Sequence, residues 1–164
     1  MGRYRPPAAK SSPYITAEGF RALQTESEKL RSRRREVVKH LSAAAAEGDR
    51  SENAEYLYRK KQLRELDRRI GYLQRRMPKL KVIRRPPGDS PAQVFFGATV
   101  ELMDGNGDKA VYRIVGADEL DPNNNGISID SPLARALLKR RIDDEVTVNT
   151  PAGMTEYVIC AIDY

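Results

Sequence analysis

Two carboxylates, Asp49 and Glu52, are the residues whose types and spacing best suit chemistry. They stand three positions apart in the stretch EGDRSEN (residues 47–53), between two long helical patterns. Carboxylate oxygens suit a hard divalent cation such as Mg²⁺, and two of them make a weak, open site with room for water and phosphate. The second interpretation is a capping box, in which Asp49 caps a helix and Glu52 is its third residue. The two are compatible, because a capping side chain can also bind a metal ion.

The rest of the sequence offers little for catalysis. His40 is the only histidine, which excludes a histidine-based metal site or catalytic triad. Cys160 lies in an apolar strand pattern and is expected in the core. As the single cysteine it excludes an internal disulfide and fits a reducing cytoplasm. No apolar stretch reaches the roughly 18 residues of a membrane span.

Positive charge is concentrated in the first half of the chain. Residues 1–85 contain 23 Lys and Arg against 10 Asp and Glu, whereas residues 86–164 contain 6 against 13. This asymmetry suggests that the first half faces a polyanion, although a solvated face is what long helices usually carry. The basic residues that could contact phosphates flank the acidic stretch: Arg31, Arg33, Arg34, Arg35, Lys39, Arg59, Lys60, Lys61, Arg64, Arg68 and Arg69.

Two helical patterns flank the acidic stretch. Steps of three and four residues in the first pattern meet Phe20, Leu23, Ser27, Leu30, Arg34, Val37, Leu41 and Ala44. The same steps in the second meet Tyr56, Arg59, Leu63, Leu66, Ile70, Leu73, Met77 and Leu80. This is the spacing of a coiled-coil seam, and a short connection makes long helices antiparallel neighbours. The sequence therefore predicts an antiparallel coiled-coil hairpin over residues 14–83, capped by Thr16, with arms that project on the order of 40 Å.

A proline-rich stretch, RRPPGDSP (84–91), is predicted to be the linker to a second domain. The predicted elements after it are strands at 94–102, 110–116, 127–129, 145–150 and 154–162, and a helix at 132–140 capped by Ser131 or Asp130. Residues 92–164 should therefore form a compact α+β domain with an antiparallel sheet and one short helix. Residues 1–13 are expected to be a disordered basic tail, because Pro, Ser and Ala there cannot bury a core.

Several of these segments resemble a known family. The stretch GDRSENAEY (48–56) looks like the tip signature of the Gre transcript cleavage factors. Four further segments resemble the GreB branch of that family: KKQLRELDRRIGYL (60–73), VFFGATVE (94–101), ISIDSPLARALLKR (127–140) and VNTPAG (148–153). The resemblance covers residues 14–164 and implies a coiled-coil hairpin followed by a domain similar to the FK506-binding-protein fold.

The resemblance also implies a function. Such a factor binds RNA polymerase at the rim of its secondary channel and inserts the hairpin, so that Asp49 and Glu52 help bind a second Mg²⁺ jointly with the polymerase. The polymerase then cuts its own backtracked RNA, and arrested complexes are rescued. The factor is expected to be a cytoplasmic monomer and no enzyme by itself, without stable Mg²⁺ binding. The basic residues expected to contact the nascent RNA 3′ end are Arg33, Arg34, Lys60, Lys61, Arg64 and Arg68.

Two other functions are weighed against this one. One alternative is a regulator that occupies the same channel and inhibits without promoting cleavage. A tip with more or rearranged acids would favour such a regulator, and the intact GDRSENAEY (48–56) argues against it. A proline isomerase needs an aromatic-lined pocket. The second domain has few aromatic residues and no Trp, which disfavours that activity: Phe95, Phe96, Tyr112, Tyr157 and Tyr164.

Overall fold

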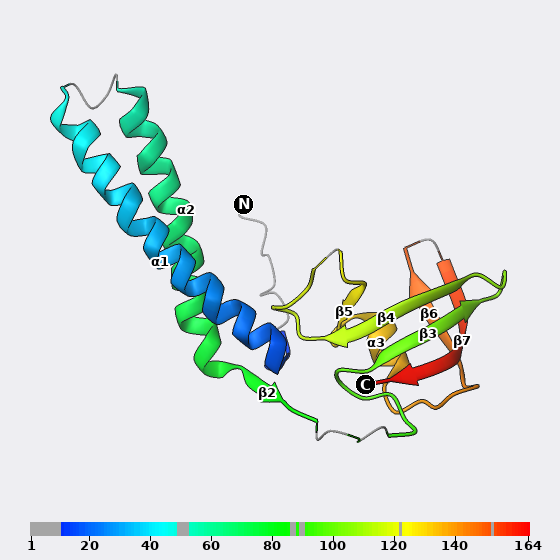
Figure 1. Ribbon diagram of the computed structural model, residues 1–164. Helices are drawn as coiled ribbons and strands as arrows, with labels where there is room; N and C mark the ends of the chain where they lie inside the picture. Colours follow the sequence, from blue (N-terminus) through cyan, green and yellow to red (C-terminus); the bar gives the residue numbers. More distant parts are fainter. Residues whose placement is uncertain (1–10, 49–52, 86–87, 89–90, 122, 152) are drawn as a thin grey trace, which may run out of the picture. The chain divides into compact units, whose positions relative to one another are not determined.

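The computed structural model describes residues 11–48, 53–85, 88, 91–121, 123–151 and 153–164. They form two compact units, shown in Figure 1. The helical unit contains Phe20–Leu80, and the sheet unit contains the described residues up to Gly19 together with those from Lys81 to Tyr164. The structure thus assigns both ends of the predicted hairpin range, 14–83, to the sheet unit. No helix in the described part of the chain has the length and apolar character needed to cross a membrane.

The helical unit consists of two long helices that lie side by side and run in opposite directions (Figure 1). Helix α1 spans Ala17–Ala46 and helix α2 spans Ala54–Arg76, followed by the 3₁₀ turn η1 at Met77–Lys79. Pro78 lies in this turn and cannot continue an α-helix, which explains the change of helix type. The predicted hairpin is confirmed.

A narrow apolar seam joins the two helices. Every predicted seam position of both helices is buried or half-buried except Arg34. The most enclosed side chains on the two helices are Leu23, Val37, Ala44, Ile70 and Leu73. An amphipathic helix is stabilised mainly by burying such a stripe, since isolated helices are marginal in water. The coiled-coil interpretation is therefore confirmed by burial.

The sheet unit is built on five strands in the order β5-β4-β3-β7-β6. Their bounds are β3 Thr99–Asp104, β4 Lys109–Val115, β5 Gly126–Ser128, β6 Glu145–Thr150 and β7 Gly153–Asp163. All neighbours are antiparallel except β4 and β5, which are parallel and so depart from the predicted antiparallel sheet. Helix α3, Pro132–Leu137, is capped by Ser131, whose Oγ accepts from the Ala134 N–H at 3.1 Å. The α+β class is confirmed.

The apolar core of this unit lies between the sheet and α3. Val100, Leu102, Ile114 and Ile159 from the central strands are fully buried with Leu137 of α3. The predicted strand at 94–102 is wrong in its first half. Val94 and Ala98 are buried in the core, but Gly97 between them has φ +88° and turns the chain out of a strand conformation.

Two strands of three residues were not predicted. Strand β1, Tyr14–Thr16, pairs in parallel with β2, Lys81–Ile83. The residues just before β1 are also held: Pro13 O accepts from the Lys81 N–H at 2.7 Å, and the Ser12 N–H donates to Asp130 at 2.8 Å. The prediction of a disordered tail over residues 1–13 is therefore wrong for its last residues, and residues 1–10 lie outside the described part of the chain.

The start of α1 is held by one carboxylate of the sheet unit. Oε1 of Glu119 accepts from the backbone N–H of Thr16 at 2.9 Å and of Gly116 at 2.7 Å, while Oε2 accepts from the Thr16 hydroxyl. The same hydroxyl oxygen accepts from the Gly19 N–H at 2.9 Å, which confirms Thr16 as the N-cap. A Cβ at Gly19 would lie 1.9 Å from Glu119 Oε2, so a larger residue there would displace the Glu119 side chain.

Candidate functional site

The turn between the two helices is closed by Asn53. Helix α1 ends at Ala46 and α2 begins at Ala54. Oδ1 of Asn53 accepts from the Tyr56 N–H at 3.1 Å, and its Nδ2 donates to the carbonyl of Ala44 at 2.9 Å. One side chain thus caps α2 and ties its start to the end of α1.

Asp49 and Glu52 lie outside the described residues. The structure nevertheless tests the capping-box interpretation of the pair, because the N-cap of α2 is Asn53 and not Asp49. The capping box with Asp49 as the N-cap of α2 is therefore wrong. Sequence reasoning missed Asn53, although asparagine just before a helical pattern is a recognised capping signal.

The donor chemistry of Asp49 and Glu52 suits Mg²⁺, but two carboxylates do not complete a site. In the part of the chain that the structure describes, no three Asp, Glu, His or Cys side chains come together. Glu47 and Glu55 flank the pair in the sequence, and Glu55 forms an ion pair with Arg59 at 2.7 Å.

Three of the predicted phosphate contacts fall on one side of α2. Lys61, Arg64 and Arg68 are spaced by three and four residues, so they line up along the helix at intervals of about 4.5 and 6 Å. All three are exposed, and among the described residues none has an ion-pair partner. Arg75, two heptads after Lys61, continues the row, and this set of four cations is called the α2 stripe. Sequence reasoning missed Arg75, although its spacing from Lys61 was the available signal.

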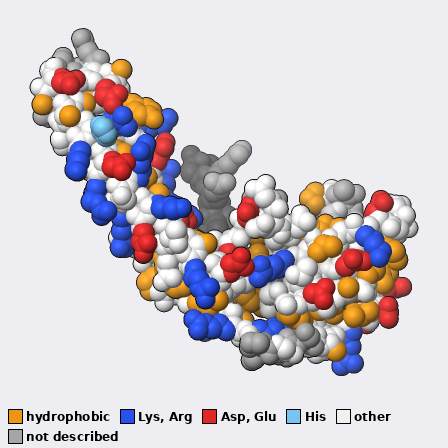
Figure 2. All heavy atoms as spheres, in the orientation of Figure 1, with side chains coloured by type: hydrophobic (Ala, Val, Ile, Leu, Met, Phe, Trp, Pro, Cys, Tyr) orange, Lys and Arg blue, Asp and Glu red, His pale blue; other side chains and the backbone are white. Residues whose placement is uncertain are grey.

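The three other residues expected to contact the RNA 3′ end have local partners within the hairpin. On α1, Arg33 pairs with Glu36 at 3.3 Å, and Arg34 pairs with Asp67 of α2 at 2.6 Å. On α2, Lys60 lies off the stripe, with its Nζ 5.8 Å from the centre of the Tyr56 ring. Basic side chains are visible on the face of the helical unit that Figure 2 shows. The structure therefore divides the predicted set into a free row and three residues with local partners.

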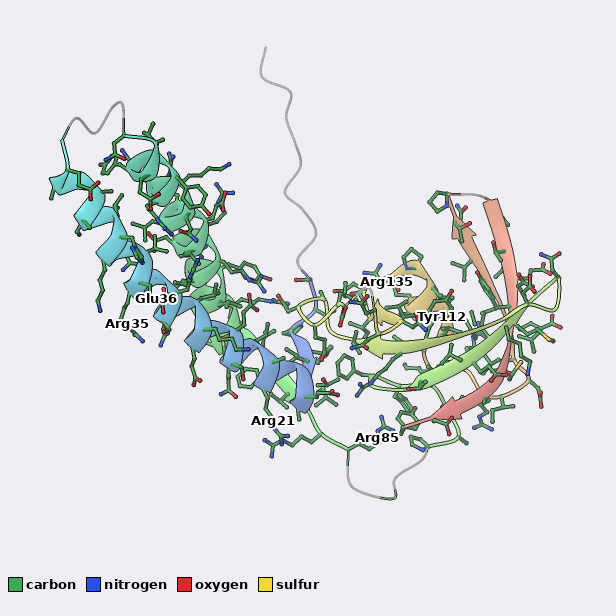
Figure 3. The ribbon with its side chains drawn as sticks, turned by 45° about the horizontal axis from the view of Figure 1, so that its top comes forward. Arg21, Arg35, Glu36, Arg85, Tyr112 and Arg135 are labelled. Atoms are coloured by element: carbon green, nitrogen blue, oxygen red, sulfur yellow. The ribbon has the colours of Figure 1, made fainter. Side chains whose placement is uncertain are left out.

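An open groove of about 460 Å³ runs between the two helices, away from the turn. Its lining consists of Arg31, Arg34, Arg35, Asp67, Ile70, Gly71 and Gln74. Gly71 has no side chain, and Nη1 of Arg75 lies 3.2 Å from the position that its Cβ would take. Arg35, labelled on α1 in Figure 3, has no ion-pair partner among the described residues. The groove thus presents unpaired positive charge and could hold an anion.

Comparisons with known proteins place both units in one family. The family described as "Transcription elongation factor, GreA/GreB, C-term" matches residues 89–164, and the one described as "Transcription elongation factor, N-terminal" matches residues 13–82.

Curated relatives match the chain along its whole length. A protein of Xanthomonas axonopodis named "Transcription elongation factor GreB" is 58% identical and covers 100% of this chain and 98% of its own. A protein of the same name from Pseudomonas aeruginosa is 53% identical with the same two coverages.

A solved structure also matches most of the chain. The GreA factor homolog 1 (Gfh1) of Thermus thermophilus is 25% identical, with a TM-score of 0.42 over 92% of this chain and 98% of that one.

Proposed function

The chain belongs to the GreA/GreB family of transcription elongation factors, and from this premise we propose that it stimulates RNA cleavage by RNA polymerase. The hairpin enters the secondary channel of a backtracked complex, and the sheet unit binds the channel rim. There, Asp49 and Glu52 supply carboxylates to an Mg²⁺ ion that the polymerase holds only weakly by itself. The factor acts in the cytoplasm and is no nuclease alone.

The observation that carries this proposal is the separation of the acidic pair from helix capping. Asn53 caps α2, so this cap does not require Asp49. Two acids on the connection between two long helices suit delivery to a distant site. With helices of 30 and 23 residues, the hairpin extends roughly 35–45 Å at about 1.5 Å per residue.

Mg²⁺ at such a site activates water and neutralises charge on the phosphodiester. The contribution of the chain itself is positioning. The seam and the Asn53 hydrogen bonds fix the ends of the two helices, so the connection between them starts from a rigid base. Holding a catalytic group on a rigid element gives it a high effective concentration at its target.

The α2 stripe supplies attraction for the RNA. A row of exposed cations that starts two turns after Asn53 would contact the phosphates of the extruded strand close to the acidic connection. Such contacts make binding dependent on salt. The groove with Arg31 and Arg35 offers a second anion-binding surface farther from the turn.

The test is a cleavage assay on a stalled, backtracked complex with RNA labelled at its 3′ end. Asp49→Asn and Glu52→Gln should each lower the cleavage rate on the order of 100-fold, as expected for loss of a group that stabilises transition-state charge. Both variants should still compete with the wild-type chain for polymerase. Glu47→Gln is the matched control, since it removes one negative charge from the same connection and should leave the rate unchanged.

Two outcomes would contradict the proposal. Wild-type rates for both carboxylate variants would exclude a role for the pair. Binding of the wild-type chain to polymerase with inhibition of synthesis and no cleavage would instead support a channel-binding inhibitor.

A further inference from the structure

The first turn of α2 holds two large apolar side chains in solvent. Leu57 is 49% exposed and Tyr58 is 58% exposed, and both lie within five residues of the N-cap Asn53. Neither belongs to the seam, where Tyr56 is half-buried. Their exposure is therefore not explained by packing between the helices.

The ring of Tyr58 is supported by an immobilised cation. The guanidinium carbon of Arg59 lies 5.4 Å from the ring centre. Arg59 itself is fixed, because its Nε donates to Glu55 at 2.7 Å and its Nη1 to Gln62 at 3.2 Å. Only 21% of its side chain is exposed. A ring held on a fixed guanidinium loses little conformational freedom when another flat group stacks on it.

Leu57 and Tyr58 lie at the end of the α2 stripe that is nearest the turn. Lys61 follows Tyr58 by three residues and Leu57 by four, so it is a surface neighbour of both on the helix. An exposed aromatic side chain beside a row of unpaired cations is the combination by which proteins bind single-stranded nucleic acids. The cations track the phosphates, and the aromatic ring stacks on a base.

We propose that Tyr58 is a stacking platform for a base of the extruded RNA, with Leu57 beside it and the RNA phosphates along the α2 stripe. This inference rests on the proposed function, because it needs RNA next to the hairpin. The proposed function involves RNA phosphates, and the Tyr58 contact adds an interaction with an RNA base. A base held against Tyr58 fixes the strand close to Asp49 and Glu52, so Tyr58 is a positioning residue that orients the RNA for cleavage.

Other tyrosines of α2 provide the contrast. Tyr56 faces the seam and is half-buried. Tyr72 also has an arginine over its ring, with Arg69 at 5.3 Å and 39% of the residue exposed, but it lies about 21 Å farther along the helix than Tyr58. Tyr72→Leu is therefore a matched control on RNA that extrudes only two nucleotides.

The test compares cleavage of two stalled complexes that differ only in the bases of the extruded nucleotides. One extrudes two normal nucleotides, and the other carries abasic residues at the same positions. For wild type and Tyr58→Phe, removal of the bases should slow cleavage about tenfold, within the range of one base–aromatic stack. Tyr58→Leu keeps the apolar volume without the aromatic face. It should be about tenfold slower on normal RNA and insensitive to removal of the bases.

Tyr72→Leu should behave as wild type on both complexes, and all variants should show unchanged helical circular dichroism. A wild-type rate for Tyr58→Leu on normal RNA would overturn the inference, as would equal slowing of wild type and Tyr58→Leu by abasic RNA. Those results leave the proposed function intact. No cleavage by the wild-type chain on either RNA would overturn the proposed function and the stacking inference with it.

Discussion

The Nε of Arg34 on α1 lies 2.6 Å from Oδ1 of Asp67 on α2, so a residue expected to contact RNA is already paired across the hairpin. Arg69 of α2 makes a second bridge, donating to both carboxylate oxygens of Glu26 at 2.7 and 2.9 Å. These pairs join the helices outside the apolar seam. Arg34 is therefore less available for RNA than the cations of the α2 stripe, which have no ion-pair partner among the described residues.

Removal of the Arg34–Asp67 pair should have a small effect on stability. Both side chains are nearly half exposed, and exposed ion pairs contribute about 0.2–1 kcal/mol. A double-mutant cycle with Arg34→Gln and Asp67→Asn should give a coupling free energy in that range from urea unfolding, decreasing in high salt. A coupling well above that range would show that the pair is a principal determinant of the hairpin.

Neutralising the α2 stripe should weaken RNA contact without affecting the fold. The triple variant Lys61→Gln, Arg64→Gln, Arg68→Gln should reduce the slope of log rate against log salt by about 2, since each single-strand phosphate contact contributes roughly 0.7. The measurement is the cleavage rate at subsaturating factor over a salt series. A control triple at Arg21, Lys29 and Lys79, exposed cations that lie farther from the turn than Arg68, should leave the slope unchanged.

Loss of the Asn53 cap should destabilise the tip half of the hairpin. Asn53→Ala removes both hydrogen bonds and should cost about 1 kcal/mol, whereas Asn53→Asp keeps a side-chain acceptor for the Tyr56 N–H and should cost less. Hydrogen exchange of the first amides of α2 measures the effect. Equal exchange in wild type and Asn53→Ala would mean that the cap is dispensable.

A methyl group at Gly116 should destabilise the sheet unit. Its Cβ would lie 2.1 Å from the carbonyl oxygen of Tyr14, so β1 would have to move, at a cost of about 1–3 kcal/mol. Gly105→Ala is the matched control, because nothing lies within 4 Å of its Cβ position and its φ is not positive. Thermal unfolding followed by tyrosine circular dichroism should separate the two variants. Equal midpoints would contradict the predicted clash.

The elements whose apolar residues recur at a regular spacing could be predicted from the sequence. The seam of the hairpin, including Leu23, Val37, Ile70 and Leu73, follows from the three-and-four spacing alone. Thr16 as the first cap follows from its residue type. The strand at 94–98 was wrong because burial of an apolar run does not require pairing in a sheet, and the chain turns at Gly97.

Features that depend on distant residues could not be predicted. Strands β1 and β2 have three residues each and pair across 67 positions of sequence, from Tyr14 to Lys81, so neither carries a periodic signal. The same holds for the contact of Glu119 with Thr16, which needs the folded sheet unit to bring the two together. At the candidate site, the basic residues were found by charge. Which of them are unpaired depends on acids of the other helix, such as Asp67.

The pairing of β1 with β2 makes the hairpin an insertion. The chain leaves the sheet unit after Gly19 and re-enters it at Lys81, and the two strands lie side by side in register. Both attachment points are therefore fixed by the same small ladder, whatever lies between them. Whole heptads could be added to or deleted from both arms without altering the sheet unit. The length of the hairpin and the surface of the sheet unit can consequently evolve, or be engineered, as independent variables.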